Sequence, residues 1–76
     1  DYGDKLHNHS NISKLWSAYL DIDLQPHDVA IMMALLKVAR TKLGQVSEDT
    51  YVDMSAYSAI AGEIKFRTSK KEKGNE

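Results

Sequence analysis

One run of apolar residues constrains this chain more than any other feature of its sequence. Between Val29 and Ala39, ten of eleven residues are apolar, and Lys37 is the exception. Pro26 suits the first position of a helix, where its missing N–H costs nothing, so we predict a helix over residues 26–43. A helix that is apolar nearly all round is buried on more than one side. Two neighbouring helices in so small a chain cannot cover it, so we also predict a homo-oligomer with this helix at or near the interface.

Two further apolar patterns flank this helix and predict helices over residues 9–20 and 50–67. They comprise Ile12, Leu15, Trp16, Tyr19 and Leu20 in the first case, and Val52, Ala56, Ile60 and Ile64 in the second. We expect the polar residues 1–9 to be an irregular lead-in and the charged residues 68–76 to be a flexible tail. Short connections between helices favour an all-α fold, a compact antiparallel three-helix arrangement that forms a single domain over residues 1–67.

Composition and charge exclude several classes of protein. The chain has 76 residues and no cysteine, which excludes disulfides and cysteine-based zinc sites. Its net charge of −1 and isoelectric point of about 6.3 argue against a nucleic-acid partner. No apolar run approaches the ~20 residues of a membrane span, so we expect no membrane partner and a cytoplasmic location. Because the chain begins with Asp1 rather than Met, we expect it to be a fragment.

Lys37 and Arg40 are the polar residues that point most directly to a binding site. They are three residues apart on one predicted helix and so share a face. Because Lys37 interrupts the apolar run, its cation needs an anion, either Asp53 from the next helix or a bound phosphate. In the functional interpretation, Lys37 and Arg40 hold phosphate. Asp53 would then orient the cations or a ribose hydroxyl, and Tyr57 would contact a base. The alternative is an internal ion-pair network that fixes the register of the helices.

Residues near the start of the chain could complete such a site. Tyr2, Gly3 and Asp4, followed by Asn8, could form a loop over the phosphate group. Gly3 would permit a close approach of the backbone or a positive φ angle. We therefore include Gly3, Asp4 and Asn8 among the candidate ligand-binding residues. The alternative is an ordinary turn.

Histidine and carboxylate residues also invite a metal interpretation. The order of His7, His9, His27 with Asp28, and Asp53 is similar to that of metal-dependent phosphohydrolases of the HD type. Imidazole and carboxylate groups suit the metals of such enzymes. The chain is far too short for that fold, however. We therefore expect no metal site and interpret the histidines as solvated side chains.

A second enzyme class is the all-α nucleoside triphosphate pyrophosphohydrolases of the MazG type. These enzymes need clustered carboxylates that hold Mg²⁺ on a triphosphate. The predicted helices offer only Asp28, Asp53 and Glu63. One chain therefore lacks the cluster, although a symmetric oligomer could bring together Asp28 or Asp53 from each chain. No serine lies in an elbow motif that would make it a nucleophile. We expect no catalytic residue and no cofactor, with Mg²⁺ required only if this alternative holds.

Several separated motifs follow one another in a fixed order along the chain. They are Tyr2-Gly3-Asp4, Asn8, Leu15-Trp16, Asp28-Val29-Ala30, Met32-Met33, Leu35-Leu36-Lys37, Ala39-Arg40, Val52-Asp53 and Tyr57. This order resembles that of a family of small phage and prophage proteins without an assigned reaction, and it covers residues 2–64. The resemblance implies a phage origin and a location in the cytoplasm of a bacterial host. It also implies a helical segment before the Gly-Asp pair.

These observations favour binding over catalysis. The preferred hypothesis is a phosphorylated nucleotide or nucleotide signal held between chains, which in a phage could sequester a host defence signal. Two alternatives stay open at this stage. One is a divergent Mg²⁺-dependent nucleotide pyrophosphohydrolase, and the other is a protein-interaction module that inhibits a host protein through a helical face.

Overall fold

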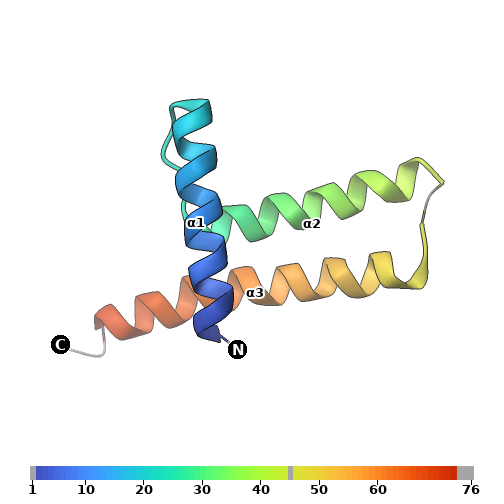
Figure 1. Ribbon diagram of the computed structural model, residues 1–76. Coiled ribbons are helices and arrows are strands. Elements are labelled where there is room, and N and C mark those ends of the chain that lie inside the picture. Colours follow the sequence, from blue (N-terminus) through green and yellow to red (C-terminus); the bar gives the residue numbers. More distant parts are fainter. Residues whose placement is uncertain (1, 45, 74–76) are drawn as a thin grey trace.

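The computed structural model describes residues 2–44 and 46–73, with the backbone alone for residues 68–73. It contains three helices, α1 (Tyr2–Leu20), α2 (Pro26–Lys42) and α3 (Glu48–Lys73). The described residues form no strand, which confirms the all-α fold class. None of the described helices is long and apolar enough to cross a membrane. Helices α2 and α3 run antiparallel as a long hairpin, and α1 crosses the hairpin near the start of α2 (Figure 1).

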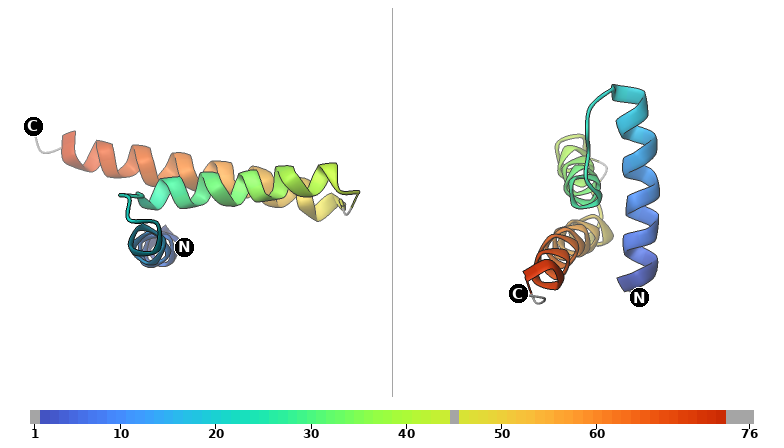
Figure 2. Two further views of the ribbon diagram at one scale, coloured as in Figure 1. Left: turned by 90° about the horizontal axis from the view of Figure 1, so that it is seen from above. Right: turned by 90° about the vertical axis from the view of Figure 1, so that its left-hand side faces the viewer.

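The first helix differs from the prediction in both extent and direction. It begins at Tyr2, so the expected irregular lead-in is wrong. Viewed along the hairpin, α1 lies across α2 and α3 rather than antiparallel to them (Figure 2). The guanidinium carbon of Arg67 lies 4.0 Å from the centre of the Tyr2 ring, and the Nδ1 of His9 lies 2.7 Å from the carbonyl oxygen of Lys5. A contact with a distant part of the chain thus helps to order a segment with little apolar periodicity of its own.

The third helix is longer than predicted at both ends. Its start is fixed by Thr50, which is 6% exposed and whose hydroxyl accepts a hydrogen bond of 3.2 Å from the backbone N–H of Ser47. The helix continues to Lys73, where the sequence predicts a flexible tail from residue 68. Lysine and glutamate are good helix formers, so charge alone does not end a helix. Residues 74–76 of the predicted tail lie outside the described residues.

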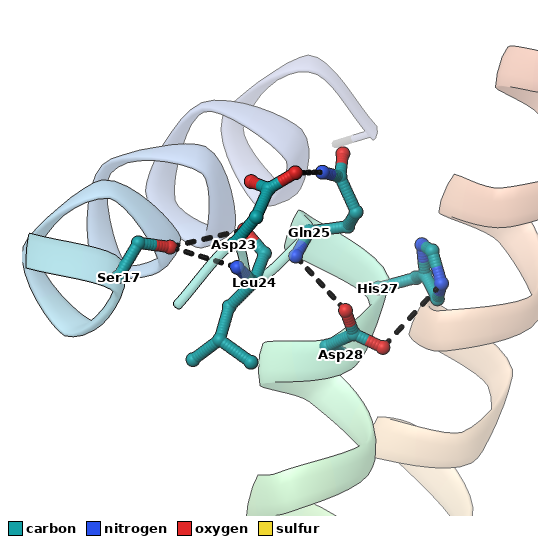
Figure 3. A network of polar contacts seen from close by, with 6 residues as sticks. All are labelled: Ser17, Asp23, Leu24, Gln25, His27 and Asp28. Atoms are coloured by element: carbon teal, nitrogen blue, oxygen red, sulfur yellow. Dashed lines mark hydrogen bonds and ion pairs between the residues drawn. The ribbon is translucent and has the colours of Figure 1, made fainter. Parts of the chain in front are cut away.

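Ser17 fixes the turn between α1 and α2. Its hydroxyl donates to the carbonyl oxygen of Leu24 at 3.3 Å and accepts from the backbone N–H of Leu24 at 2.9 Å (Figure 3). Asp21 adopts a left-handed backbone conformation with φ 56°, which aspartate tolerates better than most residues. The backbone N–H of Ile22 also donates to the carbonyl oxygen of Ser17, at 3.2 Å. Together these bonds set the direction in which α2 leaves α1.

Helix α2 begins at Pro26, as predicted, and ends one residue before the predicted boundary. The carboxylate of Asp28 accepts a hydrogen bond of 2.9 Å from the backbone N–H of Gln25, just before the helix (Figure 3). A negative charge at this place also complements the positive end of the helix dipole. Gly44, with φ 75°, then turns the chain towards α3.

The core is small and thin. The buried apolar residues in the described part are Val29, Ala30, Ala61 and Ile64. The molecule is elongated, at 48 × 28 × 17 Å, so only a small part of each helix lies against another helix. Large apolar side chains are therefore left outside. They are Leu15, Tyr19, Leu20, Ile22, Ile31, Leu35, Leu36, Val38, Leu43, Val46, Tyr51, Val52 and Phe66.

Candidate functional site

Lys37 and Asp53 form the centre of the predicted site. The Nζ of Lys37 lies 3.3 Å from the Oδ2 of Asp53, across the α2–α3 hairpin. The Lys37 side chain is 15% exposed and that of Asp53 is 46% exposed. Of the two anions that the sequence offers for Lys37, the structure supplies Asp53, a contact that the internal ion-pair alternative also predicts. Because the carboxylate remains half in water, the pair is open to exchange with another anion.

Arg40 and Tyr57 lie on either side of this ion pair. Arg40 is one turn beyond Lys37 on α2 and is exposed, and Tyr57 is one turn beyond Asp53 on α3 and is half-buried. The side chains described up to Arg67 provide no ion-pair partner for Arg40. Its guanidinium therefore offers a free planar set of donors, the geometry that suits phosphate.

The residues near the start of the chain do not join this group. Tyr2, Gly3 and Asp4 belong to the first turn of α1, so the predicted loop over the phosphate is wrong. Tyr2 packs against Arg67, which is 14 residues beyond Asp53 on α3. That spacing corresponds to about 21 Å along a helix axis. Gly3 and Asp4 therefore lie far from the Lys37 cation.

Asn8 is also helical and exposed, in the second turn of α1. That Gly3, Asp4 and Asn8 bind a ligand stays a prediction. If they do, their binding site is a different one from the site at Lys37. Sequence reasoning treated them as a loop because Gly3 and the polar residues around it give no apolar pattern. The contact between Tyr2 and Arg67 that orders this turn is made over a long sequence distance.

The histidines occupy three different environments. His7 is exposed, but His9 is only 9% exposed and bonds to the backbone, so the expectation of solvated histidines is wrong for His9. The Nε2 of His27 lies 3.5 Å from the Oδ1 of Asp28, at the start of α2 (Figure 3). Among the described residues, no three His, Cys, Asp or Glu side chains are grouped so as to hold a metal ion. The carboxylate cluster of a pyrophosphohydrolase is thus not assembled within the described part of one chain.

The described part of a single chain encloses no pocket. Each of its buried side-chain nitrogen and oxygen atoms also has a hydrogen-bond partner. A small ligand bound by one chain would therefore lie on an open surface. A more enclosed site would need residues beyond those that the structure describes.

The apolar face predicted for the first helix is more exposed than its pattern indicates. Leu15 and Tyr19 belong to the apolar face predicted for the first helix, yet they are 63% and 88% exposed. On α2, Leu35 is 60% exposed although it lies in the middle of the apolar run. The width of that run predicts the exposure of Leu35, because neighbouring helices cover only part of such a helix.

Comparison with known proteins identifies relatives of this chain. A family model described as a domain of unknown function, DUF6378, matches residues 1–65. The Gene 55 protein of Mycobacterium phage L5 is 44% identical over 61 residues, which are 79% of this chain and 39% of that protein. The Gene 55 protein of Mycobacterium phage D29 is 34% identical over 64 residues, which are 84% of this chain and 42% of that protein.

The chain therefore spans about two fifths of the length of these two curated relatives. No solved structure gives a significant match. The description of the family and the names of the two phage proteins state no ligand and no reaction. A more specific function has to be argued from the side chains of this chain.

Proposed function

This chain belongs to the DUF6378 family and is similar to mycobacteriophage proteins, and we propose that it is a phage-type binding domain for a phosphorylated ligand. The ligand class is a nucleotide or a nucleotide-like signal. Lys37 and Arg40 contact its phosphate groups, and Tyr57 contacts its base. In a phage, such binding would sequester a nucleotide signal of the host's defence.

The observation that carries this proposal is the Lys37–Asp53 pair beside an exposed arginine. Two cations and one carboxylate leave one net positive charge at this place on the hairpin. Asp53 keeps the Lys37 ammonium in place within 3.3 Å and so prevents an uncompensated charge in the absence of ligand. An arriving phosphate gains a bidentate contact from Arg40 and a second cation from Lys37. Asp53 is then free to accept a hydrogen bond from a ribose hydroxyl.

A second chain gives the ligand its enclosure. Because the described part of one chain has no pocket, the base would otherwise lie against Tyr57 with its other face in water. We therefore place the ligand between chains of a homo-oligomer. This arrangement needs no cofactor.

Native mass spectrometry and titration calorimetry with linear and cyclic nucleotides test the proposal. Arg40→Ala is the informative variant because Arg40 is exposed, so the fold should survive the change. Charge-assisted hydrogen bonds contribute about 1.5–3 kcal/mol each, so we expect the affinity to fall by a factor of about 10 to 100. Lys65→Ala is the matched control, since Lys65 is an exposed cation on α3 two turns beyond Tyr57. It should leave the affinity unchanged.

The other outcomes have defined meanings. A chain that stays empty across the whole nucleotide panel contradicts the proposal. Equal affinities for wild type, Arg40→Ala and Lys37→Ala would show that the ligand binds elsewhere. A shortened nucleotide in the presence of Mg²⁺, with loss of turnover in Asp53→Asn, would indicate the divergent pyrophosphohydrolase instead.

A second candidate function is a protein-interaction module that inhibits a host protein. The exposed outer face of α3 favours it, because Val52 and Phe66 are 14 residues apart on one side of that helix and are 57% and 63% exposed. This candidate predicts that no nucleotide binds. It also predicts that a host protein with a complementary apolar groove binds the wild-type chain and not Phe66→Ser.

A further inference from the structure

Helix α2 carries an apolar stripe on the side that faces away from the rest of the chain. Ile31, Leu35 and Val38 follow one another at helical spacing and are 44%, 60% and 42% exposed. The opposite side of the same helix faces α3, because Ala30 is fully buried and Lys37 pairs with Asp53. The view along the hairpin shows α1 and α3 against two sides of α2, with its remaining sides open (Figure 2).

Two opposite charges lie at the ends of this stripe, which we call the α2 outer stripe and define as Asp28, Ile31, Leu35, Val38 and Lys42. Asp28 is seven residues before Leu35, and Lys42 is seven residues after it. Seven residues fall only about 20° short of two full turns, so these three residues lie almost on one line along the helix. The Asp28 side chain is 41% exposed, and Lys42 is exposed.

This arrangement is complementary to itself when one copy is reversed. Rotation by half a turn about Leu35 places Asp28 of one copy opposite Lys42 of the other, and the same pair forms at the other end. A parallel pairing would instead place each charge against its own kind, which is unfavourable. Self-complementary surfaces of this kind form two-fold symmetric dimers.

A second copy would also enlarge a small core. Among the described residues, two of the four buried apolar ones are alanines, and the chain has no cysteine for a disulfide. A chain of this size buries only about 60% of its unfolded surface even when well packed. Covering Ile31, Leu35 and Val38 would add three branched aliphatic side chains from each copy to a shared core.

We propose that α2 forms an antiparallel interface between two copies of this chain, with Leu35 at the two-fold axis and two Asp28–Lys42 ion pairs. Oδ2 of Asp28 accepts a bond from the backbone N–H of Gln25, and Oδ1 lies 3.5 Å from the Nε2 of His27. Each carboxylate oxygen has a second lone pair that can accept a bond from the incoming ammonium. This interface lies on the side of α2 opposite to the Lys37–Asp53 pair, so it does not itself enclose the nucleotide site. The two proposals are therefore tested separately, because the assembly is measured without any ligand.

Sedimentation equilibrium of the purified chain tests the proposal. The wild-type chain should have twice its mass of 8.6 kDa. Leu35→Glu places two carboxylates together at the axis, so this variant should be a monomer at concentrations where the wild type is a dimer. Leu15→Glu is the matched control, because Leu15 lies on α1 and is 63% exposed, nearly the same as the 60% exposure of Leu35. The control should remain a dimer.

A charge exchange tests the ion pairs without changing the apolar residues. Lys42→Glu should raise the dissociation constant of the dimer about tenfold or more, since it places a glutamate opposite each Asp28. Adding Asp28→Lys to the same chain should recover much of that loss. Circular dichroism checks that each variant is helical, and the charge exchange decides the matter if Leu35→Glu fails to fold. A monomeric wild type, a dimeric Leu35→Glu or a dissociated Leu15→Glu would each overturn the proposal.

Discussion

At the residue scale, Ser17 has a larger structural role than its size suggests. It holds both backbone polar groups of Leu24 and so joins the end of α1 to the segment before α2. Ser17→Ala leaves the backbone N–H of Leu24 without this acceptor, and we expect a loss of about 1–3 kcal/mol in the free energy of unfolding. Thermal and urea unfolding followed by circular dichroism measure it.

Ser13→Ala is the control for this prediction. The Ser13 hydroxyl donates at 2.8 Å to the carbonyl oxygen of Ser10, within the same helix. Ser13→Ala leaves no backbone N–H without its acceptor, so this variant should lose less stability than Ser17→Ala. Equal losses in the two variants would mean that burial, and not the bond to Leu24, accounts for the effect.

Also at the residue scale, the Lys37–Asp53 ion pair should contribute a measurable coupling energy to stability. Because the Asp53 side chain is 46% exposed, water screens the attraction. A double-mutant cycle of Lys37→Met and Asp53→Asn should therefore give a coupling energy of about 0.5–1 kcal/mol in unfolding experiments. A coupling near zero would mean that Asp53 does not hold Lys37 in place for the ligand.

This pair was predictable from the sequence, because a lone cation in an apolar run requires an anion and Asp53 stands on the next helix. The separation of Gly3 and Asp4 from this pair was not predictable. Their position depends on how α1 crosses the hairpin, and that depends on contacts such as the one between Tyr2 and Arg67. Local patterns contain no information about such contacts.

At the scale of elements, Gly44 and Gly62 should respond oppositely to replacement by alanine. Gly44 has φ 75° after α2, whereas Gly62 lies within α3, and an added Cβ would meet no atom within 4 Å at either place. Gly44→Ala should therefore destabilise the chain by about 1 kcal/mol through backbone strain alone. Gly62→Ala should stabilise it by about 0.4–1 kcal/mol because alanine favours the helix.

Urea unfolding of both variants measures this difference in sign. A stabilising Gly44→Ala would mean that the turn after α2 adopts another conformation in solution. A destabilising Gly62→Ala would mean that another chain packs against α3 at Gly62.

The ends of the helices differ in how well the sequence predicts them. Pro26 marks the start of α2 in both the prediction and the structure. The start of α1 was missed by seven residues, because His9 and Tyr2 make their contacts through polar or aromatic groups that periodicity does not register. The end of α3 was missed because charged residues can continue a helix when they favour that conformation.

At the scale of the whole molecule, the exposed apolar surface is the main observation. The sequence predicts that α2 is buried on more than one side, and the structure covers only part of it within one chain. A dimer formed through the α2 outer stripe would cover Ile31, Leu35 and Val38. It would also bring the two hairpins, each with its own Lys37 and Arg40, into one particle. We therefore expect α2 to pair with α2 of a second copy in antiparallel orientation.

Disulfide formation tests this claim most directly, because the chain has no cysteine of its own. Under mild oxidation, Leu35→Cys should form a covalent dimer, since the two cysteines would meet at the symmetry axis. Lys42→Cys should stay monomeric in a denaturing gel, because each cysteine would face Asp28 and lie about 21 Å along the axis from the other. If both single variants, Leu35→Cys and Lys42→Cys, form covalent dimers, the two helices are parallel. If Leu35→Cys forms no covalent dimer, the α2 interface is contradicted altogether.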